Sequence, residues 1–158
     1  MQNRKSKTEL RLINMEKVAV EQVEWLLYPF IPYGKVTIIQ GDPGEGKTTM
    51  VLQIIAKLTK GEPVLSVKYG EEEPAEKADE PVNVIYQTAE DGLGDTIKPR
   101  LLAAGADCSK VLVIDDSEQP LTMLDERLEQ AIRQTNARLV VLDPIQSFLG
   151  AEVDMHRA

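Results

Sequence analysis

The sequence predicts an α/β fold in which a parallel β-sheet is flanked by helices. Apolar runs rich in β-branched residues, such as 82–88 and 138–143, are typical of strands buried in a parallel sheet. Segments between such runs, such as 48–58, carry apolar residues at helical spacing. A glycine-rich stretch joins the first expected strand to the first expected helix. This alternation of strands and helices indicates a parallel sheet covered on both faces.

The glycine-rich stretch over residues 41–48 reads G-x-x-x-x-G-K-T. It follows the apolar run 35–40, which we expect to be a buried strand, and it leads into the helix expected over 48–58. A glycine-rich loop between a strand and a helix is the setting that confirms a phosphate-binding loop. An ordinary tight turn is the alternative, but every fixed position of the motif matches and both flanks agree.

The residue types of this loop are suited to binding the phosphates of a nucleoside triphosphate. Its glycines let backbone N–H groups approach the phosphates closely, and the helix that follows adds unpaired N–H groups and a positive dipole end. Lys47 would contact the β- and γ-phosphates, and the Thr48 hydroxyl would hold Mg²⁺. The expected nucleotide-binding residues are Gly41, Asp42, Pro43, Gly44, Glu45, Gly46, Lys47, Thr48 and Thr49.

The remaining elements follow in order along the chain. We expect residues 1–15 to be a polar tail and 16–158 to be one domain, with an extended, turning lead-in at 28–32, where two prolines occur. Residues 61–81 are long and acidic, which favours a surface loop with some strand near 64–67. The later expected elements are strands at 82–88, 111–115 and 138–143, the last buried on both faces, and helices at 96–104, closed by Gly105, and 122–135.

Acidic residues follow three of the expected strands. Asp143 closes the last strand at its carboxyl end, where open α/β sheets gather their ligands, and is our candidate for holding Mg²⁺. Glu90 follows the second strand and is the candidate general base for activating water. Its neighbour Asp91 could cap the next helix, and both could be ordinary loop acids. Asp115 and Asp116 end the third strand in a similar way and compete with Glu90 for the catalytic role.

Composition narrows the class of protein. The 158 residues carry a net charge of −8, which argues against a free-standing nucleic-acid binder but not against an assembly that gathers basic loops in a channel. One cysteine excludes an internal disulfide and fits a reducing cytoplasm, where we expect the protein to be located. No apolar run is long enough to span a bilayer, so we expect no membrane partner.

Four blocks in the same order resemble the RecA-like P-loop ATPases: 31–35, the phosphate loop, 88–101 and 139–150. Within them the chain is similar to the plasmid- and phage-associated RepA-like hexameric helicases, often described only as AAA-family ATPases. The resemblance covers roughly residues 16–154. It implies ATP and Mg²⁺ as ligands, water activation by Glu90 and Mg²⁺ positioning by Asp143. Arg100 matches a recurrent arginine of the family without an evident role.

The resemblance also implies a hexameric ring with ATP at subunit interfaces, and DNA unwinding or translocation in the replication of a plasmid, phage or mobile element. RecA-like cores continue for several strands after the one that ends in Asp143, and one of these lies between that strand and the phosphate-loop strand. The domain therefore looks C-terminally incomplete. We expect this chain alone to bind nucleotide weakly, to be a poor ATPase and to associate, with single-stranded DNA contacts lying in regions that it lacks.

Two other functions remain open at this stage. One is a regulatory ATP-binding switch module without helicase activity. The other is a small-molecule or nucleoside kinase, which is disfavoured because a glutamate after the second strand suits water activation better than transfer to an acceptor.

Overall fold

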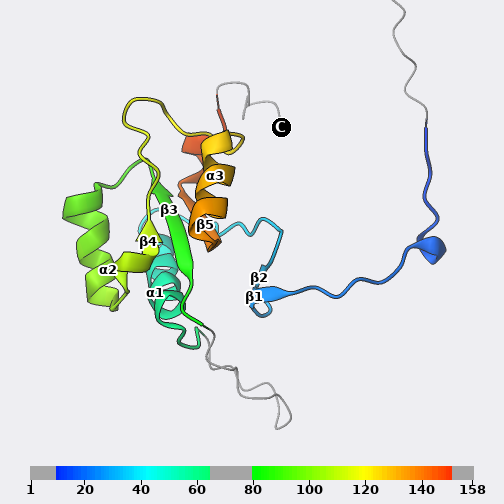
Figure 1. The fold of residues 1–158 in the computed structure, drawn as a ribbon, viewed down its shortest axis with the longest axis horizontal. Coiled ribbons are helices and arrows are strands. Elements are labelled where there is room, and N and C mark those ends of the chain that lie inside the picture. The colour runs from blue at the N-terminus through cyan, green and yellow to red at the C-terminus, as the bar shows by residue number, and fades with distance from the viewer. Residues whose placement is uncertain (1–9, 65–79, 151–158) are drawn as a thin grey trace, which may run out of the picture. The chain divides into compact units, whose positions relative to one another are not determined.

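The computed structural model describes residues 10–64 and 80–150, and the chain divides into two compact units, Met1–Thr37 and Ile38–Ala158. The strand expected near 64–67, most of the acidic loop and the C-terminal residues 151–158 lie outside the described residues. Figure 1 shows the helices and strands of the second unit, which carries the phosphate loop.

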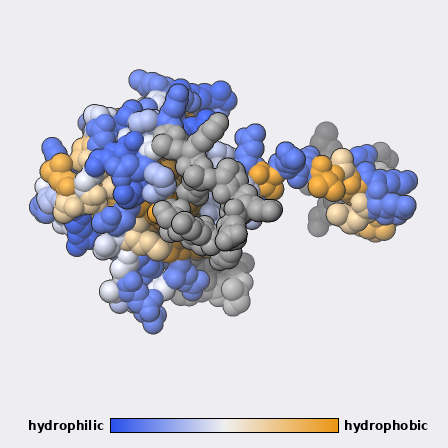
Figure 2. All heavy atoms as spheres, turned by 90° about the horizontal axis from the view of Figure 1, so that it is seen from below, coloured by the Kyte–Doolittle hydropathy of each residue, from blue (hydrophilic) through white to orange (hydrophobic). Residues whose placement is uncertain are grey.

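The first unit contains a short 3-10 helix, Met15–Lys17, and two antiparallel strands, β1 (Trp25–Leu27) and β2 (Ile31–Pro32). The extended, turning lead-in expected at 28–32 is confirmed by this pair and by the hydrogen bond from Phe30 N to Leu27 O. Apolar side chains are exposed in this unit (Figure 2). The most exposed of them are Leu10, Leu12, Ile13, Met15 and Val20.

The second unit is built on a parallel sheet of three strands in the order β4-β3-β5 among the described residues. These strands are β3 (Asn83–Thr88), β4 (Val111–Leu112) and β5 (Ala137–Asp143). The parallel sheet with flanking helices confirms the predicted fold class. β3 and β5 run in register to their ends, where Thr88 is paired with Asp143. The register brings the residues that follow β3 to the carboxyl end of β5.

In the part of the chain that the structure describes, three α-helices accompany the sheet: α1 (Lys47–Lys60), α2 (Lys98–Ala104) and α3 (Glu126–Thr135). Gly61 caps the C-terminus of α1 and Gly105 caps that of α2, both in the left-handed conformation that glycine adopts without strain. A turn of π-helix, Leu93–Ile97, precedes α2. The helices expected over 48–58 and 96–104 are therefore confirmed.

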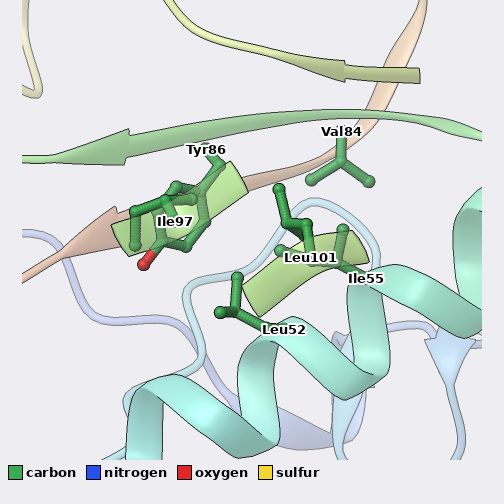
Figure 3. Packing of buried hydrophobic residues seen from close by; sticks show 6 residues of the cluster. All are labelled: Leu52, Ile55, Val84, Tyr86, Ile97 and Leu101. Atoms are coloured by element: carbon green, nitrogen blue, oxygen red, sulfur yellow. The ribbon is translucent and has the colours of Figure 1, made fainter. Parts of the chain in front are cut away.

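The core of this unit lies between α1, α2 and one face of β3. It contains six buried side chains, which Figure 3 shows from close by: Leu52, Ile55, Val84, Tyr86, Ile97 and Leu101. Alternate residues of a strand point to opposite faces, so Ile85 and Gln87 of β3, both 1% exposed, lie on the other face. α3 packs against β5, and the right-handed crossovers of parallel strands place α2 and α3 on opposite faces of the sheet.

The structure corrects the expected strand at 35–40. These residues are not a strand, and Val36 and Ile38 are 71% and 68% exposed. A strand exists only where a neighbour pairs with its N–H and C=O groups, and no described segment pairs with 36–40 or with the edge of β5 away from β3. The apolar run therefore stays an extended, unpaired approach to the phosphate loop.

Three further boundaries differ from expectation. The strand expected over 111–115 ends at Leu112. Beyond it, hydrogen bonds to the side chain of Gln87 replace backbone pairing: Ile114 N donates to Gln87 Oε1 at 2.8 Å, and Gln87 Nε2 donates to Ile114 O at 3.0 Å. The helix expected from 122 begins only at Glu126, because Asp125 caps it through Arg127 N and leaves Leu124 94% exposed outside the helix. β5 is half-buried rather than buried on both faces, since one of its edges is unpaired among the described residues.

Candidate functional site

The phosphate loop runs from Gly41 into the first turn of α1. Gly44 and Gly46 have φ values of 84° and 83°, a left-handed conformation that side chains rarely adopt, so glycine is required at both positions. α1 begins at Lys47, and the first intrahelical bond runs from Met50 N to Gly46 O at 2.9 Å. The amides of Lys47, Thr48 and Thr49 therefore have no carbonyl partner within the helix and can bind an anion.

The Lys47 ammonium lies over the loop. Its Nζ donates to Gly41 O at 2.8 Å and to Asp42 O at 2.7 Å. Asp42 N donates to Glu45 Oε2 at 2.8 Å, which closes the loop from the other side. The cation is therefore held beside the free amides by two carbonyl oxygens, where it can add positive charge toward an anion.

Asp143 joins the phosphate loop to the sheet. Thr48 Oγ1 donates to Asp143 Oδ2 at 3.0 Å, across 95 residues of sequence. Tyr86 OH donates to the same oxygen at 2.9 Å. The sequence placed Thr48 and Asp143 at one site, and the structure brings them into direct contact.

Tyr86 keeps its proton in this setting. Burial, and then the hydrogen bond to the carboxylate of Asp143, raise the pKa of Tyr86 well above its ordinary value. The side chain is fully buried, and the raised pKa keeps the phenol in its protonated, hydrogen-bond-donating form at neutral pH. Tyr86 therefore acts as a fixed donor to Asp143.

Glu90 and Asp91 follow β3 at the same edge of the sheet. Ala89 N donates to Asp143 O at 3.2 Å, which places Glu90 one residue from that contact. Glu90 is exposed, and no hydrogen bond or ion pair of its side chain is found in the part of the chain that the structure describes. Asp91 does not cap the next helix, whose N-cap is Gly92, because its carboxylate faces Arg100 at 3.7 Å instead.

The competing acids of the third strand lie elsewhere. β4 is on the side of β3 away from β5, so Asp115 and Asp116 are separated from Asp143 by the central strand. Asp115 accepts from Ser117 N at 3.1 Å, and hydrogen bonds from Ser117 lower the pKa of this carboxyl. Gln87 Nε2 lies 3.4 Å from Asp116 Oδ2. Both acids form hydrogen bonds within their own loop or to Gln87, so Glu90 remains the better candidate for the general base.

A cleft of about 520 Å³ opens between the phosphate loop and α2. Its walls come from the loop and α1 on one side and from α2 on the other; the lining residues are Gly44, Gly46, Lys47, Thr48, Thr49, Leu52, Gln53, Arg100, Ala103 and Ala104. Glu90 and Asp143 are not among them. The cleft is large enough for part of a nucleotide, and its mixed polar and apolar lining with a single guanidinium suits a base or sugar beside the phosphates.

Sequence reasoning missed two residues of this site. Arg100 had no assigned role, and it lies in the cleft wall opposite the phosphate loop. The sequence pattern indicates Tyr86 only as part of an apolar strand, whereas in the structure its hydroxyl contacts Asp143. The available signal for Tyr86 was its hydroxyl, because a tyrosine hydroxyl in a buried strand usually has a hydrogen-bond partner.

Thr48 and Asp143 fit a magnesium ion chemically. Both offer hard oxygen atoms, and Mg²⁺ is usually bound by one or two such protein groups together with substrate phosphates and water. Within the described residues no cluster of three or more His, Cys, Asp or Glu side chains could hold a metal alone. A metal here would therefore depend on the nucleotide for most of its ligands.

These features, a phosphate loop followed by a helix and facing an aspartate at the end of a parallel strand, define a P-loop ATPase domain of RecA-like type. The chain belongs to the AAA domain family, whose model matches residues 2–158. It is 29% identical over 121 residues to the DNA repair protein RadA of Halalkalibacterium halodurans, an alignment that covers 76% of this chain and 21% of that protein. The chain thus spans about a fifth of the length of the relative it matches.

No solved structure matches the chain significantly. Among the helices that the structure describes, none has both the length and the apolar character needed to cross a membrane.

Proposed function

We propose that this domain binds ATP with Mg²⁺ and hydrolyses it, and that hydrolysis is coupled to work on DNA. The observation that carries the proposal is the contact between Thr48 Oγ1 and Asp143 Oδ2. It joins the end of the phosphate loop to the carboxyl end of β5, which is the arrangement needed to hold a nucleotide and its metal ion together.

Binding would begin at the phosphate loop. The free amides at the start of α1 and the ammonium of Lys47 provide donors and positive charge for the β- and γ-phosphates. The remainder of the nucleotide would lie along the cleft, between Gln53 of α1 and Arg100 of α2. Mg²⁺, held near Thr48 and Asp143, would neutralise charge on the transferred phosphoryl group.

Hydrolysis needs a base to orient a water molecule and accept its proton. Glu90 is the second residue after β3, next to Ala89, whose N–H bonds Asp143 O at the end of β5, and its exposed carboxylate has no competing partner among the described residues. An ionised carboxylate within one water of the γ-phosphate can act as this base. We therefore assign this role to Glu90, with Lys47 stabilising the charge that develops on the phosphate.

Coupling to DNA is the finer part of the proposal. The relative identified by sequence is a DNA repair protein, and the four blocks of the sequence resemble plasmid- and phage-associated hexameric helicases. We propose a homo-oligomer, a hexameric ring in the full-length protein, that unwinds or translocates along DNA during replication of a plasmid, phage or mobile element.

The test is phosphate release from ATP, measured with Mg²⁺, with a chelator, and with or without single-stranded DNA. We expect release to require Mg²⁺, to be lost in Asp143→Asn and to rise with DNA. Mg²⁺-dependent turnover that DNA leaves unchanged would favour a regulatory switch module. Transfer of the γ-phosphate to an acceptor rather than to water would contradict the ATPase assignment.

A further inference from the structure

Tyr86 occupies two environments at once. Its ring belongs to the buried cluster between α1, β3 and α2, and its exposed fraction is 0%. Figure 3 shows its hydroxyl at the end of this cluster, pointing away from Val84 and Leu101. That hydroxyl donates to Asp143 Oδ2 at 2.9 Å. The buried ring of Tyr86 therefore fixes the position of its hydroxyl, and this is the only tyrosine hydroxyl that reaches the candidate site among the described residues.

The two donors to Asp143 differ in how firmly they are held. Thr48 lies in the first turn of α1, at the end of the phosphate loop, and its hydroxyl is itself a candidate magnesium ligand. Tyr86 differs from Thr48, because its ring is buried in the same cluster as Leu52 and Ile97 and its hydroxyl is not a candidate metal ligand. The Tyr86 hydroxyl is thus a donor to Asp143 that is anchored in the core rather than in the phosphate loop.

Both donors use Oδ2 of Asp143, and no partner of Oδ1 is found in the described part of the chain. A fixed donor on Oδ2 restricts the rotation of the carboxylate and leaves Oδ1 as the oxygen that would be available toward a magnesium ion. Groups that orient a metal ligand in this way commonly change metal affinity by about 10- to 100-fold when they are removed.

From this geometry we infer that Tyr86 is a positioning residue for Mg²⁺-dependent nucleotide binding, acting through Asp143. The inference rests on the proposed function, since it assigns a role within the same site. It adds that the core of the domain and its metal affinity are coupled through one phenol hydroxyl.

The test is Tyr86→Phe, which removes the hydroxyl and keeps the ring in the core. Tyr28→Phe is the matched control, because Tyr28 is 56% exposed and lies in the first unit. Calorimetric titration with ATP at a series of Mg²⁺ concentrations gives the half-saturating Mg²⁺ concentration. We expect this concentration to rise about tenfold or more in Tyr86→Phe, with the affinity for ATP in chelator and the Tyr28→Phe values unchanged.

A double-mutant cycle separates positioning from packing. If Tyr86 acts through Asp143, Tyr86→Phe has no further effect on the Mg²⁺ dependence in an Asp143→Asn background. A purely structural role would lower the urea midpoint of Tyr86→Phe and leave the Mg²⁺ dependence at the wild-type value, which would overturn the inference while the proposed function stood. Wild-type protein that binds no ATP at any Mg²⁺ concentration would overturn both.

Discussion

Replacing Arg100 with alanine tests whether the cleft beside the phosphate loop is the nucleotide site. Arg100 lies in the cleft wall, and its only ion pair among the described residues is with Asp91 at 3.7 Å. The side chains of this pair are 53% and 35% exposed. Exposed pairs at this distance stabilise a fold by about 0–1 kcal/mol at most. We therefore expect Arg100→Ala to change the free energy of unfolding by less than about 1 kcal/mol.

Nucleotide affinity should respond more strongly than stability. A guanidinium that contacts a phosphate or sugar oxygen contributes about 1.5–3 kcal/mol, and releasing it from Asp91 costs up to about 1 kcal/mol. The net loss in Arg100→Ala is then about 0.5–3 kcal/mol, which corresponds to an affinity about 2- to 150-fold weaker. Titration calorimetry with ATP and Mg²⁺ measures this change directly.

Arg133→Ala is the matched control, because Arg133 forms an exposed ion pair with Glu129 on α3, away from the cleft. Its affinity for ATP should equal that of the wild type. An Arg100→Ala affinity within the error of the control would refute the assignment of this cleft. A loss of stability as large as the loss of affinity would show that Arg100 supports the fold instead.

Three further outcomes are expected. Glu90→Gln should lower the rate of phosphate release by about 10²- to 10⁴-fold with little change in ATP affinity; an unchanged rate would exclude Glu90 as the base. Ile55→Ala, at a position with 0% exposure, should lower the free energy of unfolding by about 2–5 kcal/mol in urea titration, and a loss below about 1 kcal/mol would contradict the assigned core. Hydrogen bonds from the side chain and backbone of Arg127 lower the pKa of Asp125. The stability that this carboxylate contributes is complete above its unfolded pKa of about 3.9 and is lost as pH falls through the lower folded value. Urea midpoints should therefore fall less between pH 5 and pH 2 in Asp125→Asn than in the wild type, and an equal fall would refute this role.

Much of the second unit could be predicted because its signals are local. The glycines at 44 and 46 are required by left-handed backbone, and helix ends at Gly61 and Gly105 follow from the same property. The apolar, β-branched composition of the strand that ends in Thr88 indicates that this strand is buried. Each of these features depends on a few neighbouring residues, so sequence patterns were sufficient.

The features that were missed depend on distant partners. Residues 36–40 have the composition of a buried strand, yet a strand requires a neighbour, and no described segment pairs with them. The bond between Tyr86 and Asp143 depends on the register of β3 against β5, which sequence alone does not determine. Arg100 lines the same cleft as the phosphate loop because α1 and α2 pack together on one face of the sheet.

The most direct test of the account is ATP binding to Lys47→Ala, measured by titration calorimetry with and without Mg²⁺. Lys47 Nζ is held by Gly41 O and Asp42 O beside the free amides of α1. Losing this charged donor should weaken binding by about 1.5–3 kcal/mol, or about 10- to 150-fold. Lys57→Ala is the control on the same helix, since within residues 10–64 and 80–150 Lys57 pairs only with exposed Glu62, and it should bind ATP as the wild type does. Equal affinities for Lys47→Ala and the wild type would contradict the claim that residues 41–48 bind the triphosphate.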